Sequence, residues 1–376
     1  MLTLDTMKII NFMECAPRFL WHIIDYSFVL GLKQKKHSGS CVIRIGGIGD
    51  MILSIPLLSG LSSSGRETTI VCEDKNKCIE FILKKHVSNI IYYNKKKFKG
   101  SPSYRRRLLR SLRLKGFDEV IQSGISRQQG GADVLLWACN ANKSFGFNPR
   151  KWNKCEISIS NKWFHTLVDG HYNEIHEIER MEMLAKTVGC NPGEHLTKNK
   201  SNNNGKFIVC VAASSPVREW GIDNFINLSR IVRKLTGFLP VFIGEKKDLS
   251  KIKCHIDFEH INLIGETSFF ELYELISNSN FIITNDSGPM HIGVILNVPT
   301  IAIVSGGEYN SYCNYPEKYR ENILTVSNND KSCFNCGWNC IYKESDNYPF
   351  PCLSSISVDD VILAIKMWPK FMEFLS

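Results

Sequence analysis

The stretch FIITNDSGPMHIGVILNVPTIAI, residues 281–303, joins two apolar runs through a short polar loop and a helix-compatible segment. Apolar runs that alternate with helical segments are typical of a parallel sheet covered by helices. Pro289 suits the first turn of a helix, because its φ is fixed and its missing N–H is not needed there. The stretch therefore predicts a strand, a loop, a helix that begins at Pro289, and a second parallel strand.

The loop in this stretch carries groups that suit an anion. Asp286 or Ser287 can cap the following helix, and Gly288 lets the backbone approach a ligand closely. The amides at the start of the helix would face outward at the positive end of its dipole. The predicted anion-binding loop consists of Asp286, Ser287, Gly288, Pro289, Met290 and His291.

The same alternation extends along most of the chain. Strands are expected at 41–45, 68–72, 88–93, 117–122, 206–212, 239–243, 260–264, 280–284 and 299–304. Helices are expected at 51–63, 76–85, 103–115, 128–138, 222–236, 246–254, 268–277 and 289–296. A polar stretch rich in turn-forming residues, 191–205, reads as a linker. A length of 376 residues also exceeds one ordinary core, so we expect an α/β protein with two Rossmann-like halves.

Composition narrows the class of protein. Hydrophobic residues make up 43% of the chain, which fits a globular protein better than a disordered or membrane-spanning one. The formal charge of +9 favours acidic partners. Several of the 14 cysteines, such as Cys41, Cys72 and Cys210, fall inside apolar runs and are typical of a reduced compartment. No cleavable signal sequence is apparent, so we expect a cytoplasmic protein.

A second loop, IRIGGIGDM at 43–51, follows the first expected strand. Gly46, Gly47 and Gly49 allow close approach of the backbone to a ligand, and Asp50 stands at the entry of the next helix. Gly47 and Gly49 fit part of a dinucleotide fingerprint, but Ile52 replaces the third glycine, and a carboxylate would repel a pyrophosphate. Asp50 is then either part of a ligand site or merely a helix cap.

A third loop, VAASSPVREWGIDNF at 211–225, suits phosphate. Ser214 and Ser215 offer hydroxyls and amides, and Arg218 adds a permanent cation with forked donors. The alternative is that these are ordinary turn serines and a surface arginine.

The motifs VIRIGGIGDMILSIPLL, SSPVREWGIDNF and TNDSGPMHIGVILNVPTIAI, taken together, closely resemble those of glycosyltransferase family 9, the lipopolysaccharide heptosyltransferases and their relatives. The resemblance covers residues 41–365. It implies a GT-B fold, in which two Rossmann-like domains face each other across a cleft. The domains expected from it are an amphipathic segment at 1–38, an acceptor-binding domain at 39–190, the linker at 191–205, a nucleotide-sugar-binding domain at 206–356 and a C-terminal helix at 357–376 that returns to the N-terminal domain.

The resemblance also implies roles for individual residues. Asp50 matches the catalytic base that deprotonates the acceptor hydroxyl. Arg218 matches a basic residue that contacts the donor phosphates, with Ser214 and Ser215 beside it. Glu245 matches, loosely, an acid near the ribose. The implied reaction is inverting transfer of a heptose, expected from ADP-heptose, to a lipopolysaccharide-core or related surface glycan, with no cofactor required for catalysis.

Two further stretches suggest membrane or glycan contact. Between Ile9 and Leu32, the polar residues recur at intervals of three and four, as on an amphipathic helix, and lysines follow. This segment either lies in the surface of an anionic membrane on the cytoplasmic side or packs on its own domain. A basic run from Lys95 to Lys115 is either a solvated helix face or a surface for an acidic or phosphorylated acceptor, and no nucleic-acid module accompanies it.

A cysteine-rich segment, 333–352, has the spacing C-x2-C-x3-C-x11-C. Its first pair is spaced as in a metal knuckle, but the remainder is not a standard zinc ribbon. A structural zinc, free thiols and a disulfide are the alternatives. The residues are Cys333, Cys336, Cys340 and Cys352.

Two other functions are compatible with parts of this pattern. A nicotinamide-dependent oxidoreductase would share the Rossmann-like halves, but the missing third glycine argues against it. A catalytically silent sugar-nucleotide or glycan-binding protein, or a transferase that uses another nucleotide sugar, is the remaining alternative.

Overall fold

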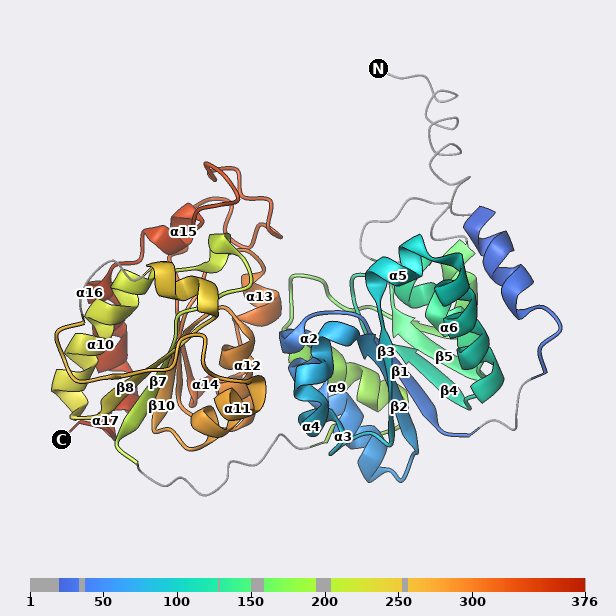
Figure 1. The fold of residues 1–376 in the computed structure, drawn as a ribbon, viewed down its shortest axis with the longest axis horizontal. Coiled ribbons are helices and arrows are strands. Elements are labelled where there is room, and N and C mark those ends of the chain that lie inside the picture. The colour runs from blue at the N-terminus through green and yellow to red at the C-terminus, as the bar shows by residue number, and fades with distance from the viewer. Residues whose placement is uncertain are drawn as a thin grey trace, which may run out of the picture. The chain divides into compact units, whose positions relative to one another are not determined.

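The computed structural model describes residues 20–33, 38–127, 129–149, 159–193, 204–251 and 256–375. The chain divides into two compact units. The first consists of Met1–Tyr172 and Arg180–Glu194, and the second of Asn173–Glu179 and His195–Ser376. Each unit contains one six-stranded sheet whose paired strands are all parallel (Figure 1). The predicted α/β fold class is confirmed.

The sheet of the first unit has the strand order β3-β2-β1-β4-β5-β6. Its strands are β1 (Ser40–Arg44), β2 (Thr68–Glu73), β3 (Asn89–Tyr93), β4 (Glu119–Gln122), β5 (Lys143–Phe147) and β6 (Thr166–Val168). Its helices are α2 (Ile48–Leu53), α3 (Ile55–Ser63), η1 (Asp74–Ile79), α4 (Glu80–Leu83), α5 (Lys95–Gly100), α6 (Pro102–Lys115), η2 (Gln129–Asp133), α7 (Val134–Cys139), η3 (Asn161–Trp163) and α9 (Glu177–Thr187), whose first three residues count with the second unit. A further helix spans residues 20–29 in the described part of the chain.

The second sheet has the order β12-β11-β10-β7-β8-β9. Its strands are β7 (Lys206–Cys210), β8 (Leu239–Ile243), β9 (Ile261–Asn262), β10 (Phe281–Asn285), β11 (Thr300–Ile303) and β12 (Ile323–Val326). Its helices are η4 (Pro216–Arg218), α10 (Ile222–Thr236), η5 (Lys246–Lys251), α11 (Phe269–Ser277), α12 (Gly288–Ile295), α13 (Tyr309–Tyr312), α14 (Glu317–Arg320), α15 (Pro351–Ser354), α16 (Val358–Met367) and α17 (Pro369–Met372).

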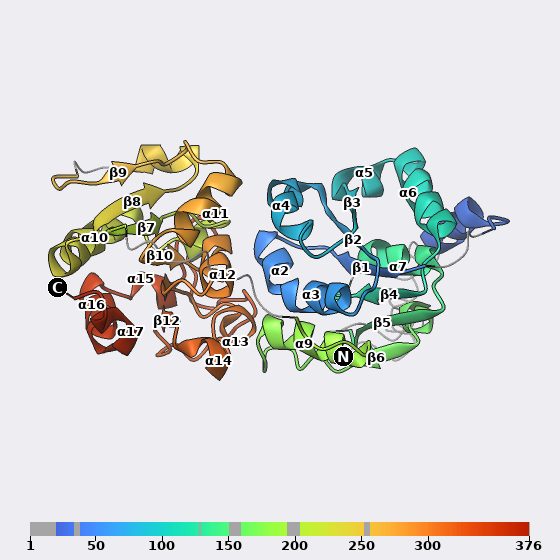
Figure 2. The same ribbon diagram turned by 90° about the horizontal axis from the view of Figure 1, so that it is seen from below.

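Strand β10, which begins the stretch at residues 281–303, is central in the second sheet. All five of its residues are buried, because β11 and β7 flank it and helices cover both faces. Figure 2 shows α10, α16 and α17 on one side of this sheet and α11 and α12 on the other. The carboxyl end of β10 therefore leads directly into the loop before α12.

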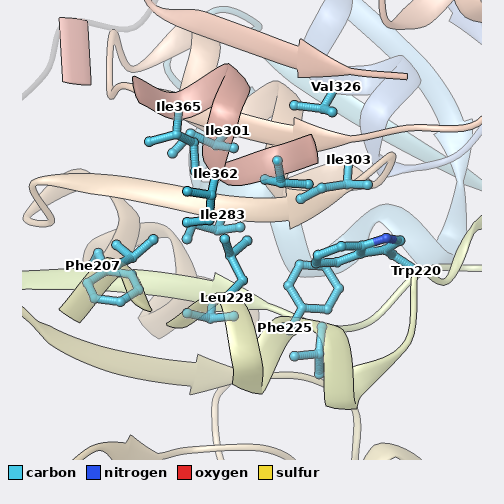
Figure 3. Close-up of a cluster of buried hydrophobic side chains, with 14 of the residues drawn as sticks. Phe207, Trp220, Phe225, Leu228, Ile283, Ile301, Ile303, Val326, Ile362 and Ile365 are labelled. Atoms are coloured by element: carbon cyan, nitrogen blue, oxygen red, sulfur yellow. The ribbon is translucent and has the colours of Figure 1, made fainter. Parts of the chain in front are cut away.

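The core of the second unit follows from strand periodicity. Alternate residues of neighbouring strands, such as Phe207, Ile283 and Ile301, point to the same face and pack against α10 and α16 (Figure 3). The rings of Phe207 and Phe281 stack at 5.0 Å across the β7–β10 pair. A contiguous core of this kind fixes the strand ends from which the loops project.

The C-terminal segment belongs to this core. Ile362, Ile365 and Phe371 of α16 and α17 are buried with the side chains of the second sheet. The apolar face of this segment packs beside β12 and α10 of its own unit. A capping box between Ser357 and Asp360 starts α16.

The helix at residues 20–29 packs on the first unit through a face that combines Asp25 with the apolar Val29 and Phe28. Asp25, which was expected in the polar stripe, is buried, and its carboxylate pairs with Arg105 of α6. Arg105 is therefore not part of a solvated basic face, although Lys96, Lys97, Arg106 and Arg107 are exposed. Within the described ranges, none of the helices combines the length and the apolar character that a membrane span requires.

Candidate functional site

In the second unit, the ends of three neighbouring strands carry the predicted site residues. Strands β8, β7 and β10 are adjacent and parallel, so the loops after Ile243, Cys210 and Asn285 leave the sheet at the same edge. Ligands of open parallel sheets gather at this edge. The topology therefore brings the loops that contain Glu245, Arg218 and Asp286 to one end of the sheet.

Arg218 is the centre of a group of contacts in this unit. It lies in η4, whose Arg218 N–H donates to the carbonyl of Ser215 at 3.0 Å. Its guanidinium donates to the Ser214 hydroxyl and lies 3.6 Å from the Asp286 carboxylate. It also lies 5.2 Å from the ring centroid of Trp338. The side chain keeps 25% of its surface exposed, so its free donors can still reach a ligand.

Asp286 is almost fully buried, with 4% of its surface exposed. Burial raises the pKa of its carboxyl above the ordinary value, and the Arg218 guanidinium offsets this only in part. The N-cap of α12 is Ser287, without a side-chain capping bond. The interpretation of Asp286 as a helix cap is therefore replaced by a structural pairing with Arg218.

The start of α12 presents backbone rather than side chains. Ser287, Gly288 and Pro289 are partly exposed, whereas Met290 and His291 are buried. The His291 Nδ1 atom lies 2.6 Å from the hydroxyl of Tyr315, whose pKa burial raises well above its ordinary value. Any contact of Met290 or His291 with an anion at this loop would thus be made by the main chain.

A glycine inside α12 sets the position of this helix on the sheet. A Cβ at Gly293 would approach Ile282 Cδ1 to 2.7 Å and would also meet Thr300. Glycine therefore lets α12 pack closely on β10 and β11, which carries the helix start to the strand end.

Asn285 is a site-shaping residue that we did not predict from the sequence. Its amide donates to the carbonyl of Val211 at 2.8 Å and accepts from the N–H of Trp220 at 3.0 Å. The last residue of β10 thus ties together both ends of the Ser214–Arg218 loop. A buried asparagine at a strand end was the available signal in the sequence.

Glu245 lies at the same sheet edge but in a local network of its own. Its carboxylate pairs with Lys247 at 3.0 Å, its N–H donates to Asp248 at 2.8 Å, and the side chain is exposed. The structure leaves it accessible to a ligand in the loop after β8, the strand that pairs with β7, which precedes Arg218.

In the first unit, the predicted carboxylate Asp50 is held from two sides. Arg44 Nη2 donates to Asp50 Oδ1 at 2.9 Å, and the Gly47 N–H donates to Oδ2 at 2.8 Å. Asp50 is the third residue of α2, so the Gly47 bond also caps this helix. Both interpretations of Asp50 are thus compatible with the structure, because one oxygen caps and 27% of the side chain stays exposed.

Arg44 was missed by the sequence interpretation because it is one charge within an apolar strand. It is buried at the end of β1, and its Nη1 also donates to the carbonyl of Ser123 at 2.7 Å. Gly46 completes the arrangement, since a Cβ there would lie 2.5 Å from Asp50 Oδ2. Gly49 lies in the first turn of α2, partly exposed.

The four cysteines of the cysteine-rich segment lie in or against a small apolar cluster. Cys340 and Cys352 are buried with Val217 and Phe350, and Cys333 and Cys336 pack against them. All four are free thiols, and the described residues contain no group of three or more His, Cys, Asp or Glu that could hold a metal ion. The structural zinc is therefore unsupported, and the segment packs as a thiol-containing apolar cluster.

Trp338 gives this segment a second contact with the site. It adopts a left-handed conformation with φ of 67°, and its ring lies where a Cβ of Gly307 would have to be. The Gly337 N–H donates to the Gly307 carbonyl at 2.7 Å and fixes the approach. The indole ring therefore supports the Arg218 guanidinium from within the cysteine-rich segment.

The two α/β units, each with a parallel six-stranded sheet, define the GT-B class of fold. The family model described as "Glycosyltransferase family 9 (heptosyltransferase)" matches residues 105–336. The chain belongs to glycosyltransferase family 9.

Individual relatives are distant. Lipopolysaccharide heptosyltransferase 1 of Campylobacter coli is 25% identical over 178 residues, which are 46% of this chain and 47% of that protein. The chain thus matches about half the length of that curated relative. The crystal structure of a glycosyltransferase family 9 protein from Veillonella parvula superposes with a TM-score of 0.68 at 19% identity, over 91% of this chain and all of that one. E. coli heptosyltransferase WaaC, solved with ADP-2-deoxy-2-fluoro heptose, gives 0.62 at 13% identity, over 87% of this chain and 98% of that one. These structural likenesses establish the fold.

Proposed function

We propose that the protein is an inverting glycosyltransferase that transfers a heptose from ADP-heptose to a lipopolysaccharide-core or related surface glycan. The observation that carries this proposal is the group formed by Arg218, Ser214 and the start of α12 at one sheet edge. Family membership supplies the reaction class, and the WaaC complex supplies the donor class for a related fold.

The donor diphosphate binds at the second unit in this proposal. Arg218 contributes two charge-assisted hydrogen bonds to phosphate oxygens, and the first amides of α12 contribute the positive end of a helix dipole. Glu245, at the end of the neighbouring strand, accepts from the ribose hydroxyls. As the bond to the anomeric carbon breaks, negative charge grows on the departing ADP, and these donors stabilise it without a catalytic metal.

The acceptor is activated at the first unit. The exposed part of the Asp50 carboxylate takes the proton of the acceptor hydroxyl, which attacks the anomeric carbon from the face opposite the ADP and inverts its configuration. Arg44 and the Gly47 N–H hold the carboxylate in one orientation, so little reorganisation is needed before proton transfer. Arg44 is a positioning residue in this scheme.

The acceptor also defines where the enzyme works. A lipid-linked core glycan is held at a membrane, so we place the reaction in the cytoplasm at the inner face of the inner membrane. The net charge of +9 favours acidic partners, such as an anionic membrane surface and a phosphorylated or acidic acceptor. The lack of a recognisable nucleic-acid module in the sequence argues against nucleic acid.

The test is a donor screen followed by a transfer assay. Purified protein is titrated with ADP, UDP, GDP, CDP and dTDP, and then incubated with ADP-heptose and a heptose-free lipid-linked acceptor. We expect a clear preference for ADP and a product with inverted anomeric configuration. Preference for another nucleotide would replace the donor, and donor binding without transfer to any acceptor would support a silent binding protein instead.

A further inference from the structure

The helix at residues 20–29 turns a row of apolar side chains outward, although Val29 packs inward. Leu20, Ile23, Tyr26 and Leu30 expose between 51% and 64% of their surface, and they recur at intervals of three and four, so they form one row along the helix. A helix on the surface of a globular protein normally shows the opposite arrangement, with its polar and charged side chains facing the solvent.

The inward side of the same helix carries the polar residues Asp25 and His22 beside the buried Val29, and it is firmly held. The Asp25 carboxylate accepts two hydrogen bonds from Arg105, at 2.5 and 2.6 Å, and both residues are buried. The Arg105 guanidinium also lies 4.2 Å from the centroid of the Phe98 ring. His22 packs between Trp137 and Trp163. This pairing fixes the rotation of the helix about its axis, so the apolar row is held outward.

Basic and aromatic groups surround this row. Trp21, His22 and Trp163 line a cavity of about 300 Å³ together with Lys99 and the Asp25–Arg105 pair. Lys33 is exposed just beyond the end of the helix, and Lys96, Lys97, Arg106 and Arg107 are exposed on the adjoining α5 and α6. Figure 1 shows the helix lying alongside α6. Apolar side chains bordered by interfacial aromatics and cations are the composition that binds the surface of an anionic bilayer.

We infer that helix 20–29 docks the first unit on an anionic membrane surface, with the row Leu20, Ile23, Tyr26 and Leu30 inserted at the level of the headgroups. The Asp25–Arg105 pair fixes the orientation of the helix relative to α6. A second copy of the chain fits less well, because a symmetric contact would bring two sets of exposed lysines and arginines together. This inference identifies the surface through which the protein contacts the membrane. Its biological meaning rests on the proposed function.

The test uses vesicle binding alone, without donor or acceptor. The full chain is sedimented with vesicles of phosphatidylcholine and with vesicles that also contain phosphatidylglycerol. We expect binding to the phosphatidylglycerol vesicles, weakened by salt, and a loss on the order of tenfold or more in the variant Leu20→Ser/Ile23→Ser/Leu30→Ser. The control is Leu363→Ser/Met367→Ser on α16, which removes two exposed apolar side chains (62% and 75%) from the second unit and should leave binding unchanged.

Three results would overturn the inference: no binding of the unaltered chain to phosphatidylglycerol vesicles, equal loss in both variants, or a dimer that only the helix variant dissociates. Because the substituted side chains are exposed, the thermal midpoint should stay unchanged and report that the variant is folded. If vesicles bind as expected and heptose transfer fails, the proposed function falls while this inference stands.

Discussion

Each unit has an arginine–carboxylate pair near the carboxyl end of a sheet strand: Arg44–Asp50 in the first unit and Arg218–Asp286 in the second. The two pairs differ in which partner is buried. In the first unit, Arg44 exposes 3% of its side chain and Asp50 exposes 27%. In the second unit, Arg218 exposes 25% and Asp286 exposes 6%. The first pair therefore offers its carboxylate to a ligand, and the second offers its guanidinium.

This difference assigns different chemistry to the two loops. A hidden arginine that orients an accessible carboxylate is suited to proton abstraction. A hidden carboxylate that orients an accessible arginine is suited to phosphate binding. In the proposed mechanism, the same two residue types thus provide a base in one loop and an anion site in the other, according to which partner the fold buries.

The largest effect is expected at the exposed carboxylate. Asp50→Asn keeps an oxygen that can accept from the Gly47 N–H but removes the base, so kcat for heptose transfer should fall by about 10²–10⁴-fold. Asp360→Asn is the matched control, because Asp360 has the same capping position in α16. Wild-type turnover in Asp50→Asn, with an unchanged thermal midpoint, would remove the base from this loop.

A smaller but still large effect is expected at the exposed arginine. Arg218→Met should weaken ADP binding by roughly 10- to 100-fold, because charge-assisted bonds to phosphate contribute about 1.5–3 kcal/mol. It should also destabilise the fold, because Asp286 loses its buried partner. Calorimetry and thermal unfolding measure the two effects separately.

A double variant sharpens this comparison. Adding Asp286→Asn to Arg218→Met should restore stability but not ADP affinity, since the orphaned carboxylate is gone while the phosphate donor is still missing. Arg230→Met, which breaks an exposed pair with Asp257, is the control and should change neither quantity appreciably. Recovery of ADP affinity in the double variant would mean that Arg218 acts only by neutralising Asp286.

Trp338 should have a modest influence on the same loop. Trp338→Ala should weaken ADP binding about two- to fivefold, because a cation–π contact contributes about 0.5–1 kcal/mol. Trp338→Phe retains an aromatic face and should lose less. Equal losses in both variants would indicate that the indole acts through packing against Gly307 rather than through the guanidinium.

The smallest effect is the pH dependence of stability that arises from Asp286. Its pKa is raised in the folded state by burial, so the folded protein binds the proton more tightly than the unfolded chain does. Its contribution to the free energy of unfolding is therefore fully present below the ordinary carboxyl pKa and is lost as pH rises through the folded pKa. Subtracting the profile of Asp286→Asn from that of the unaltered chain should give a difference that declines with pH, and a rising difference would contradict the burial argument.

Much of the fold could be predicted because the inner strands are continuous apolar runs. The expected strands at 68–72, 239–243 and 280–284 fall within one residue of β2, β8 and β10. Strands β5, β6 and β12 were not predicted: β5 contains a glycine, and β6 and β12 are edge strands of three and four residues. Short strands of this kind carry little periodicity and depend on their neighbours.

The candidate site was predictable only in its loops. The glycines, serines and prolines of the three loops at 43–51, 211–225 and 284–293 indicated backbone that could approach a ligand, and Arg218 and Asp50 stood out as charges at strand ends. The partners of these charges could not be predicted, because Arg44 and Trp338 reach them through the tertiary packing of separate segments. The orientation of helix 20–29 was hidden for the same reason, since periodicity shows two faces but not which one is buried.

The most direct test of the contrast between the two pairs is a calorimetric titration of ADP into Asp50→Asn and Arg218→Met, side by side with the unaltered chain. We predict that Asp50→Asn binds ADP with the affinity of the unaltered chain, while Arg218→Met loses at least about tenfold. Weakened binding in Asp50→Asn together with full affinity in Arg218→Met would contradict the assignment of base and anion site to these two loops.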